Sequence, residues 1–82
     1  MTYTLAIQDT ARRDIRALSP EIARRVINKL ELLRQNLSGD VKRLTQHSPA
    51  YRLRVGDYRV LFDVLGNVLM IQRVIHPSLQ SV

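Results

Sequence analysis

The sequence predicts an α+β domain in which one strand and two helices precede a three-stranded antiparallel meander. Three observations predict it: alternating apolar residues near the N-terminus, two stretches of helical periodicity, and three strand-like runs separated by Gly-containing dipeptides. The 82 residues fit a single domain spanning residues 1–82. We therefore expect two antiparallel helices packed on a mostly antiparallel sheet.

The N-terminal segment changes its hydrophobic period after residue 8. Tyr3, Leu5 and Ile7 alternate with small or polar residues, which is the period-2 pattern of a short strand with one buried face. From residue 9 to residue 18 the apolar residues recur at helical spacing. A strand followed directly by a first helix is predicted.

A second helix is predicted to begin after Ser19. The Ser19 hydroxyl can cap it, and Pro20 suits the first turn because an N–H there has no intrahelical partner. Apolar residues then recur every three or four positions, at Ile22, Val26, Leu30, Leu33 and Leu37. Gly39 is expected to end this helix, since glycine readily adopts the left-handed conformation found at helix C-termini.

The C-terminal half is strand-like after a connector. Residues 41–50 have no clear period and are predicted to be irregular. Three strand-like runs follow, at residues 51–55, 58–65 and 68–75. The dipeptides Gly56-Asp57 and Gly66-Asn67 separate them, and both have the composition of tight hairpin turns.

Basic residues dominate the charge. The chain has 13 Lys and Arg residues against 7 Asp and Glu, a formal net charge of +6, and all of the basic residues except Lys29 and Lys42 are Arg. Because a guanidinium group pairs bidentately with phosphate and stacks on bases, we expect a polyanion or an acidic protein as partner. A basic surface that serves only solubility is the alternative.

Several classes of protein are excluded or disfavoured by composition. The absence of Cys excludes a disulfide scaffold, a thiolate zinc site and a Cys nucleophile. No apolar run reaches the roughly 18–20 residues of a membrane span, and the N-terminus lacks the charged start of a signal peptide. We expect a soluble cytoplasmic protein with no membrane partner, no cofactor and no metal site.

A two-residue turn at Gly56-Asp57 would place three arginines on one face of the sheet. It pairs Arg54 with Arg59 and puts Arg52 beside them, while the apolar residues of both strands face the core. Two arginines directly opposite each other repel by some tenths of a kcal/mol. The pattern therefore indicates an anion site; the alternative is that the long side chains splay apart in solvent.

A two-residue turn at Gly66-Asn67 predicts a second register. The pairs would be Asp63 with Met70, Leu61 with Gln72, Arg59 with Val74, and Asp57 with His76. This register brings His76 to the edge of the arginine face, where an imidazole ring would suit proton transfer. A longer turn would shift the register by one residue. The alternative for His76 itself is an exposed residue without a functional role.

The central run of the chain resembles a known family. The run Tyr51-Arg52-Leu53-Arg54-Val55-Gly56-Asp57-Tyr58-Arg59-Val60, preceded by Gly39-Asp40-Val41-Lys42-Arg43-Leu44, resembles the signature of the RelE/ParE toxin superfamily. The order of elements agrees from about residue 2 to residue 76. The resemblance implies a toxin of a type II toxin–antitoxin system, either a ribosome-dependent mRNA endonuclease of the RelE branch or a DNA gyrase inhibitor of the ParE branch.

For the RelE branch the resemblance implies specific site residues. The positions of Arg52, Arg54 and Arg59 lie in the RNA-cleaving face, with His76 as a candidate proton-transfer group. Lys42 and Arg43 are expected to bind RNA together with Arg52 and Arg54. Clustered guanidinium groups would stabilise the negative charge that builds on the phosphoryl oxygens during cleavage.

The C-terminal end departs from the family pattern. Many members continue after the last strand with Val-Gly-His-Arg and a later Tyr, whereas this chain reads Val74-Ile75-His76-Pro77 and has no such Tyr. The change removes a phosphate clamp and a stacking or proton-transfer group, so a catalytically degenerate member is a further alternative.

The resemblance also implies partners. For either toxin branch we expect a cognate antitoxin, an acidic or amphipathic segment that wraps the outer surfaces of the toxin and forms a hetero-oligomer with it. For the RelE branch the ribosome and mRNA are expected as further partners.

Overall fold

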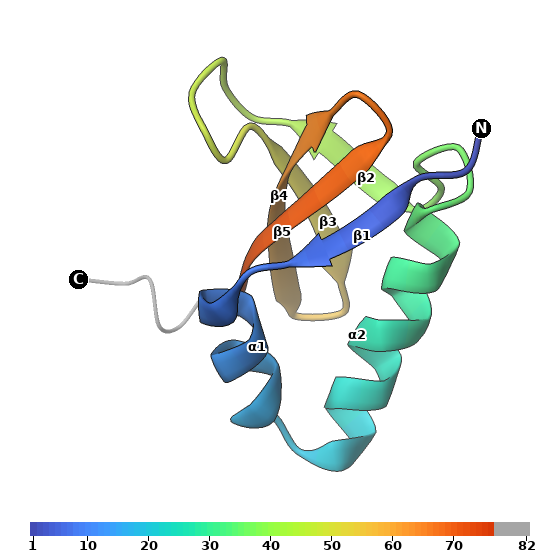
Figure 1. Cartoon of the computed structure of the whole chain (residues 1–82). Coiled ribbons are helices and arrows are strands. Elements are labelled where there is room, and N and C mark those ends of the chain that lie inside the picture. The colour runs from blue at the N-terminus through green and yellow to red at the C-terminus, as the bar shows by residue number, and fades with distance from the viewer. Residues whose placement is uncertain (77–82) are drawn as a thin grey trace.

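A computed structural model describes residues 1–76 and contains two helices and five strands. Their order is β1 (Thr4–Ile7), α1 (Asp9–Arg16), α2 (Pro20–Leu33), β2 (Asp40–Arg43), β3 (Tyr51–Val55), β4 (Tyr58–Leu65) and β5 (Val68–Ile75). The strands form one sheet in the order β1-β5-β4-β3-β2 (Figure 1). β1 and β5 run parallel, and the other neighbouring pairs run antiparallel. The predicted α+β class is confirmed.

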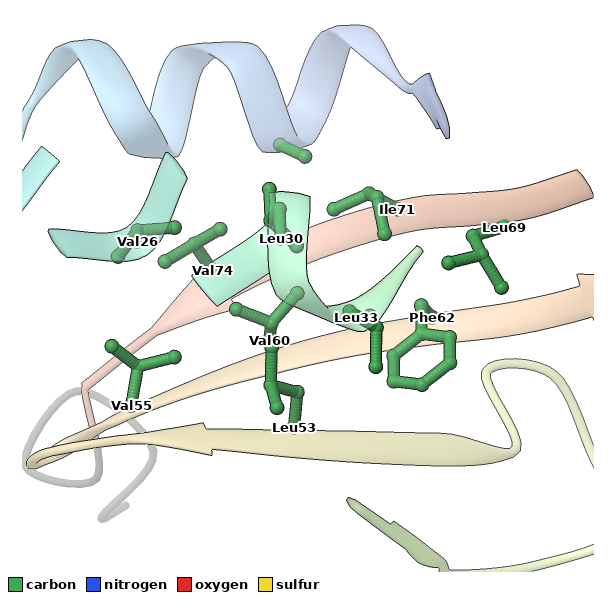
Figure 2. Packing of buried hydrophobic residues seen from close by; sticks show 11 residues of the cluster. Val26, Leu30, Leu33, Leu53, Val55, Val60, Phe62, Leu69, Ile71 and Val74 are labelled. Atoms are coloured by element: carbon green, nitrogen blue, oxygen red, sulfur yellow. The ribbon is translucent and has the colours of Figure 1, made fainter. Parts of the chain in front are cut away.

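The core lies between α2 and one face of the sheet. Val26, Leu30 and Leu33 of α2 are fully buried, and Figure 2 shows them beside apolar side chains of the strands. The strands contribute Leu53, Val55, Val60, Phe62, Leu69, Ile71 and Val74. Burying a large apolar side chain stabilises a fold by about 1.5–3 kcal/mol. The strands that contribute to the core therefore point their apolar side chains toward α2 and their polar side chains toward the opposite face.

The start of α2 follows local chemistry. The Ser19 hydroxyl accepts a hydrogen bond from the Ile22 amide at 3.4 Å, and Pro20 occupies the first turn, both as predicted. Within residues 1–76 neither helix is long and apolar enough to cross a membrane.

Helix α1 lies against the edge of β5, beyond the point where β1 ends. The Thr10 hydroxyl donates to the carbonyl oxygen of Gln72 at 2.6 Å, and the Asp14 carboxylate accepts from the amide of Val74 at 2.9 Å. Residues four apart lie on the same side of a helix, so α1 satisfies edge groups of β5 that β1 is too short to reach.

Two predictions for residues 34–50 were wrong. α2 ends at Leu33, four residues before the apolar stripe does, because the following residues hydrogen-bond to the N-terminal segment. The Tyr3 amide donates to the Arg34 carbonyl oxygen at 2.8 Å, and the Asn36 amide donates to the Met1 carbonyl oxygen at 2.9 Å. Residues 40–43, predicted to belong to the end of the helix and to a connector, form the edge strand β2.

The β3–β4 register is the predicted one, whereas the β4–β5 register is only partly so. Arg54 lies opposite Arg59, as expected. On β5 the ladder begins as predicted, with Asp63 opposite Met70, but a β-bulge intervenes between Leu61 and Phe62. The partner of Leu61 is consequently Arg73 instead of Gln72, and the partner of Arg59 is Ile75 instead of Val74. Gln72 is the extra residue of the bulge.

Candidate nucleic-acid interface

Basic side chains gather on the sheet face opposite to α2. Arg54 and Arg59 lie directly across from each other, and Lys42 of β2 lies across from Arg52. The side chains line an open depression of about 420 Å³, formed by Lys42, Leu44, Arg52, Arg54, Arg59 and Leu61. The three arginines that the sequence predicts as a group are therefore brought together by the fold.

The core determines the direction of these arginines. Leu53 and Val55 are buried under α2, and successive residues of a strand point to opposite faces. Arg52 and Arg54 must therefore point away from the core. The basic face is thus held by the rigid sheet, without any loop to position it.

Arg52 forms an ion pair on this face. The Asp40 carboxylate lies 3.8 Å from the Arg52 guanidinium, and the Arg52 side chain is only 16% exposed whereas that of Asp40 is 61% exposed. Arg54 instead donates from Nε to the Gly56 carbonyl oxygen at 3.3 Å. Arg54 and Arg59 are both exposed, so a bound phosphate would relieve their mutual repulsion with charge-assisted hydrogen bonds.

A second, smaller hollow lies at the end of the β3–β4 hairpin. Its volume is about 120 Å³, and its lining is Arg54, Gly56, Asp57, Tyr58 and Arg59. Since Arg54 and Arg59 line both hollows, the positive surface extends from the depression to the tip of the hairpin.

The structure does not bring His76 to the arginine face, which corrects the prediction. The bulge at Gln72 shifts the end of β5 by one residue, and a one-residue shift moves a side chain to the opposite face. The His76 ring contacts the edge of the Tyr58 ring, with 5.0 Å between centroids, and Tyr58 packs on the core side. Pro77 and the residues after it lie outside the described residues.

Arg43 also lies away from the depression. Its guanidinium carbon is 5.7 Å from the centre of the Tyr51 ring, and Tyr51 stacks on the buried Phe62 ring at 5.5 Å. Adjacent strand residues point to opposite faces, so Lys42 joins the arginines and Arg43 does not.

One charged cluster was missed by sequence reasoning. The Arg73 guanidinium donates to the Asp14 carboxylate at 2.8 and 3.2 Å. Burial alone would raise the pKa of Asp14, but these hydrogen bonds, that from the Val74 amide and the Coulombic attraction of Arg73 together lower it. The sequence showed Asp14 as a helix surface charge, because its partners lie 59 and 60 positions away.

A polar cluster around Asp63 holds the connector before β3. The Asp63 carboxylate accepts from the Ala50 amide at 2.8 Å, from Gln72 Nε2 at 2.5 Å and from the Ser48 hydroxyl. These contacts fix the connector to β4 and β5. Within residues 1–76 no group of three or more His, Cys, Asp or Glu side chains lies in a position to hold a metal ion.

The fold agrees with comparisons to known proteins. The family described as the ParE toxin of the type II toxin–antitoxin system parDE matches residues 5–79. The chain belongs to this family of type II toxins, within the RelE/ParE superfamily. It is also 37% identical over 41 residues to Toxin RelE3 of Methanocaldococcus jannaschii, a match that covers 50% of this chain and spans about half (47%) of the length of that relative.

Solved toxin–antitoxin complexes share the architecture. The RelBE2 complex of Mycobacterium tuberculosis contains a chain that superposes with a TM-score of 0.80 at 30% identity, covering 93% of this chain and 99% of that one. The RelE–RelB complex of Pyrococcus horikoshii OT3 contains one with a TM-score of 0.75 at 26% identity, covering 93% and 96%. The RelE/ParE-like fold is therefore shown over nearly the whole chain.

Proposed function

We propose that this toxin is a ribosome-dependent mRNA endonuclease that inhibits translation. The observation that carries the proposal is the placement of Arg54 directly opposite Arg59 at a depression that also takes in Arg52 and Lys42. The four basic side chains form a positively charged surface that can bind a phosphodiester. The open shape of the depression suits a nucleic-acid strand better than a small molecule that must be enclosed.

The chemistry of strand cleavage matches these groups. Attack of a ribose 2′-oxygen on the adjacent phosphorus concentrates negative charge on the phosphoryl oxygens, and preorganised guanidinium groups stabilise that charge. Arg52 and Arg54 project from a strand whose other face places Leu53 and Val55 in the core, so little reorganisation is needed. Because arginine stays protonated, these residues stabilise charge and do not act as general bases.

A second candidate function, inhibition of DNA gyrase by binding, is favoured by the family match, since that family is described as the ParE toxin. In this case the basic face would bind without cutting. Growth arrest would then accompany altered DNA supercoiling while mRNA stays intact.

An antitoxin partner is part of the proposal. The similar chains from Mycobacterium tuberculosis and Pyrococcus horikoshii were solved as complexes with antitoxins. With a net charge of +6 and an exposed arginine face, this chain is suited to an acidic segment that folds as it binds and masks the site. A toxin of this kind acts in the cytoplasm, where its ribosomal target lies.

The test is mRNA cleavage by the purified protein, mapped by primer extension with and without translating ribosomes. We expect cuts that require ribosomes and that are lost in Arg54→Ala. The matched control is Arg24→Ala, which removes the same exposed charge from α2. Intact mRNA with a wild-type protein that still arrests growth would refute the endonuclease and favour gyrase as the target.

A further inference from the structure

Of the four residues predicted as catalytic, only the three arginines lie on this face within residues 1–76, and arginine does not accept a proton. His76 was the candidate, and it lies on the core side of the sheet against Tyr58. A 2′-hydroxyl that attacks phosphorus must give up its proton, and a guanidinium group cannot take it. Within residues 1–76, the other side chains of the basic face are therefore the candidates for the general base.

The edge strand β2 supplies a carboxylate on the same face of the sheet, beside Arg52. Asp40 lies directly across from Arg54 in the β2–β3 ladder, so its side chain projects on the same face as the arginines. Its carboxylate is 3.8 Å from the Arg52 guanidinium, longer than the 2.7–3.2 Å of an ordinary N–H···O hydrogen bond. The carboxylate is attracted to the Arg52 guanidinium. Because 61% of the Asp40 side chain is exposed, the carboxylate can still accept a hydrogen bond from a further donor.

Lys42 completes a pair of proton carriers on the same strand. Residues 40 and 42 point to the same face, about 6.7 Å apart along the strand. Lys42 lies across from Arg52 and lines the depression. In an in-line displacement the attacking and leaving oxygens lie on opposite sides of the phosphorus, so one phosphate can lie between the two side chains.

Resting on the proposed function, we propose that Asp40 is the general base of the cleavage and Lys42 the general acid. The Asp40 carboxylate takes the proton of the ribose 2′-hydroxyl, whose oxygen forms a bond to phosphorus. The bond from phosphorus to the 5′-oxygen breaks, and the Lys42 ammonium donates a proton to that oxygen. The products are a 2′,3′-cyclic phosphate and a 5′-hydroxyl, and both side chains return to their starting states by exchange with water.

The experiment compares three variants in the ribosome-dependent cleavage assay, with and without sodium formate. Asp40→Ala should lower the cleavage rate by roughly 10²–10⁴-fold, the range that a general base contributes. Formate should restore part of this rate in proportion to its concentration, whereas sodium chloride at the same ionic strength should not. Glu31→Ala removes one exposed negative charge from α2 and should cleave like the wild type with or without formate.

Asp40→Asn separates proton transfer from positioning. The amide keeps an oxygen that can face Arg52 but is not a base, so this variant should be as slow as Asp40→Ala and should resist formate, because the site is filled. If Asp40→Asn or Asp40→Ala retained more than about a third of the wild-type rate, or if formate failed to accelerate Asp40→Ala, Asp40 would not be the base although the endonuclease would stand. A wild-type protein that cuts no mRNA would overturn both proposals.

Discussion

The two hairpins of the sheet have similar turns and differ in what sets their register. In β3–β4 the turn at Gly56-Asp57 is followed by an uninterrupted ladder from Val55–Tyr58 to Tyr51–Phe62. In β4–β5 the ladder starts in the same way and then loses one residue of register at Gln72. At that place α1 provides partners for the Gln72 carbonyl and the Val74 amide. The turn residues thus set the register next to the turn. Further along β5, α1 provides hydrogen-bond partners for the strand in a register that is shifted by one residue.

The difference has a functional consequence. The arginine face is built on the β3–β4 hairpin, whose register is set by its own turn residues. All three predicted arginines lie where a two-residue turn at Gly56-Asp57 places them. His76 follows the hairpin whose register depends on α1, and it lies on the other face. Positions predicted beyond the bulge are therefore wrong by one residue, whereas the positions predicted across the Gly56-Asp57 turn are confirmed.

The largest effect is expected from a change in the strand that both hairpins share. Phe62 is fully buried, stacks on Tyr51 and lies beside the bulge, across from Ile71. Phe62→Ala should lower the free energy of unfolding by about 3–5 kcal/mol, because it leaves a cavity under α2. Urea denaturation measures this loss.

The control for Phe62→Ala is Leu65→Ala on the same strand, where the side chain is 62% exposed and the expected change is within about 0.5 kcal/mol. Equal losses in the two variants would mean that the core does not hold the hairpins together as described.

A smaller effect is expected from a change that strikes only the β4–β5 hairpin. Asp14→Asn replaces the carboxylate that accepts from Arg73 and from the Val74 amide. It should lower the free energy of unfolding by about 2 kcal/mol, the scale of hydrogen bonds to a charged group. Hydrogen exchange should accelerate at Val74 and stay unchanged at the amides of β3, and Asp9→Asn on the same helix should leave both unaffected.

Acid should remove the same contribution from the wild-type protein. The folded state lowers the pKa of Asp14 below its ordinary value of 3.8, so the carboxylate binds protons more readily in the unfolded state. The stabilisation is complete above that ordinary value and is lost as the pH falls through the lowered folded-state pKa. The stability difference between wild type and Asp14→Asn should therefore shrink as the pH falls below about 5. A difference that grew in acid would contradict the assignment.

Much of the fold was predictable because its signals are local. The Ser19 cap, the two hairpin turns and the alternation along β3 and β4 follow from neighbouring residues. The early end of α2, the edge strand β2 and the bulge at Gln72 do not, because each depends on contacts between distant segments. The same holds for the site: Arg52, Arg54 and Arg59 were predictable, whereas Asp40 joins them only once β2 is seen to pair with β3.

The smallest effect is expected from a change that removes the repulsion between Arg54 and Arg59, on which the candidate site of the β3–β4 hairpin is based. Arg59→Gln keeps a polar side chain, shorter than that of arginine, and removes one of the two charges that face each other across the ladder. In the absence of an anion it should raise the free energy of unfolding by roughly 0.2–1 kcal/mol at low salt. The gain should vanish near 1 M salt, where the screening length falls to about 3 Å, whereas Arg24→Gln on α2 should show no such salt-dependent gain. A stabilisation equal in the two variants would mean that only net charge matters, and that the pair at positions 54 and 59 carries no strain for a phosphate to relieve.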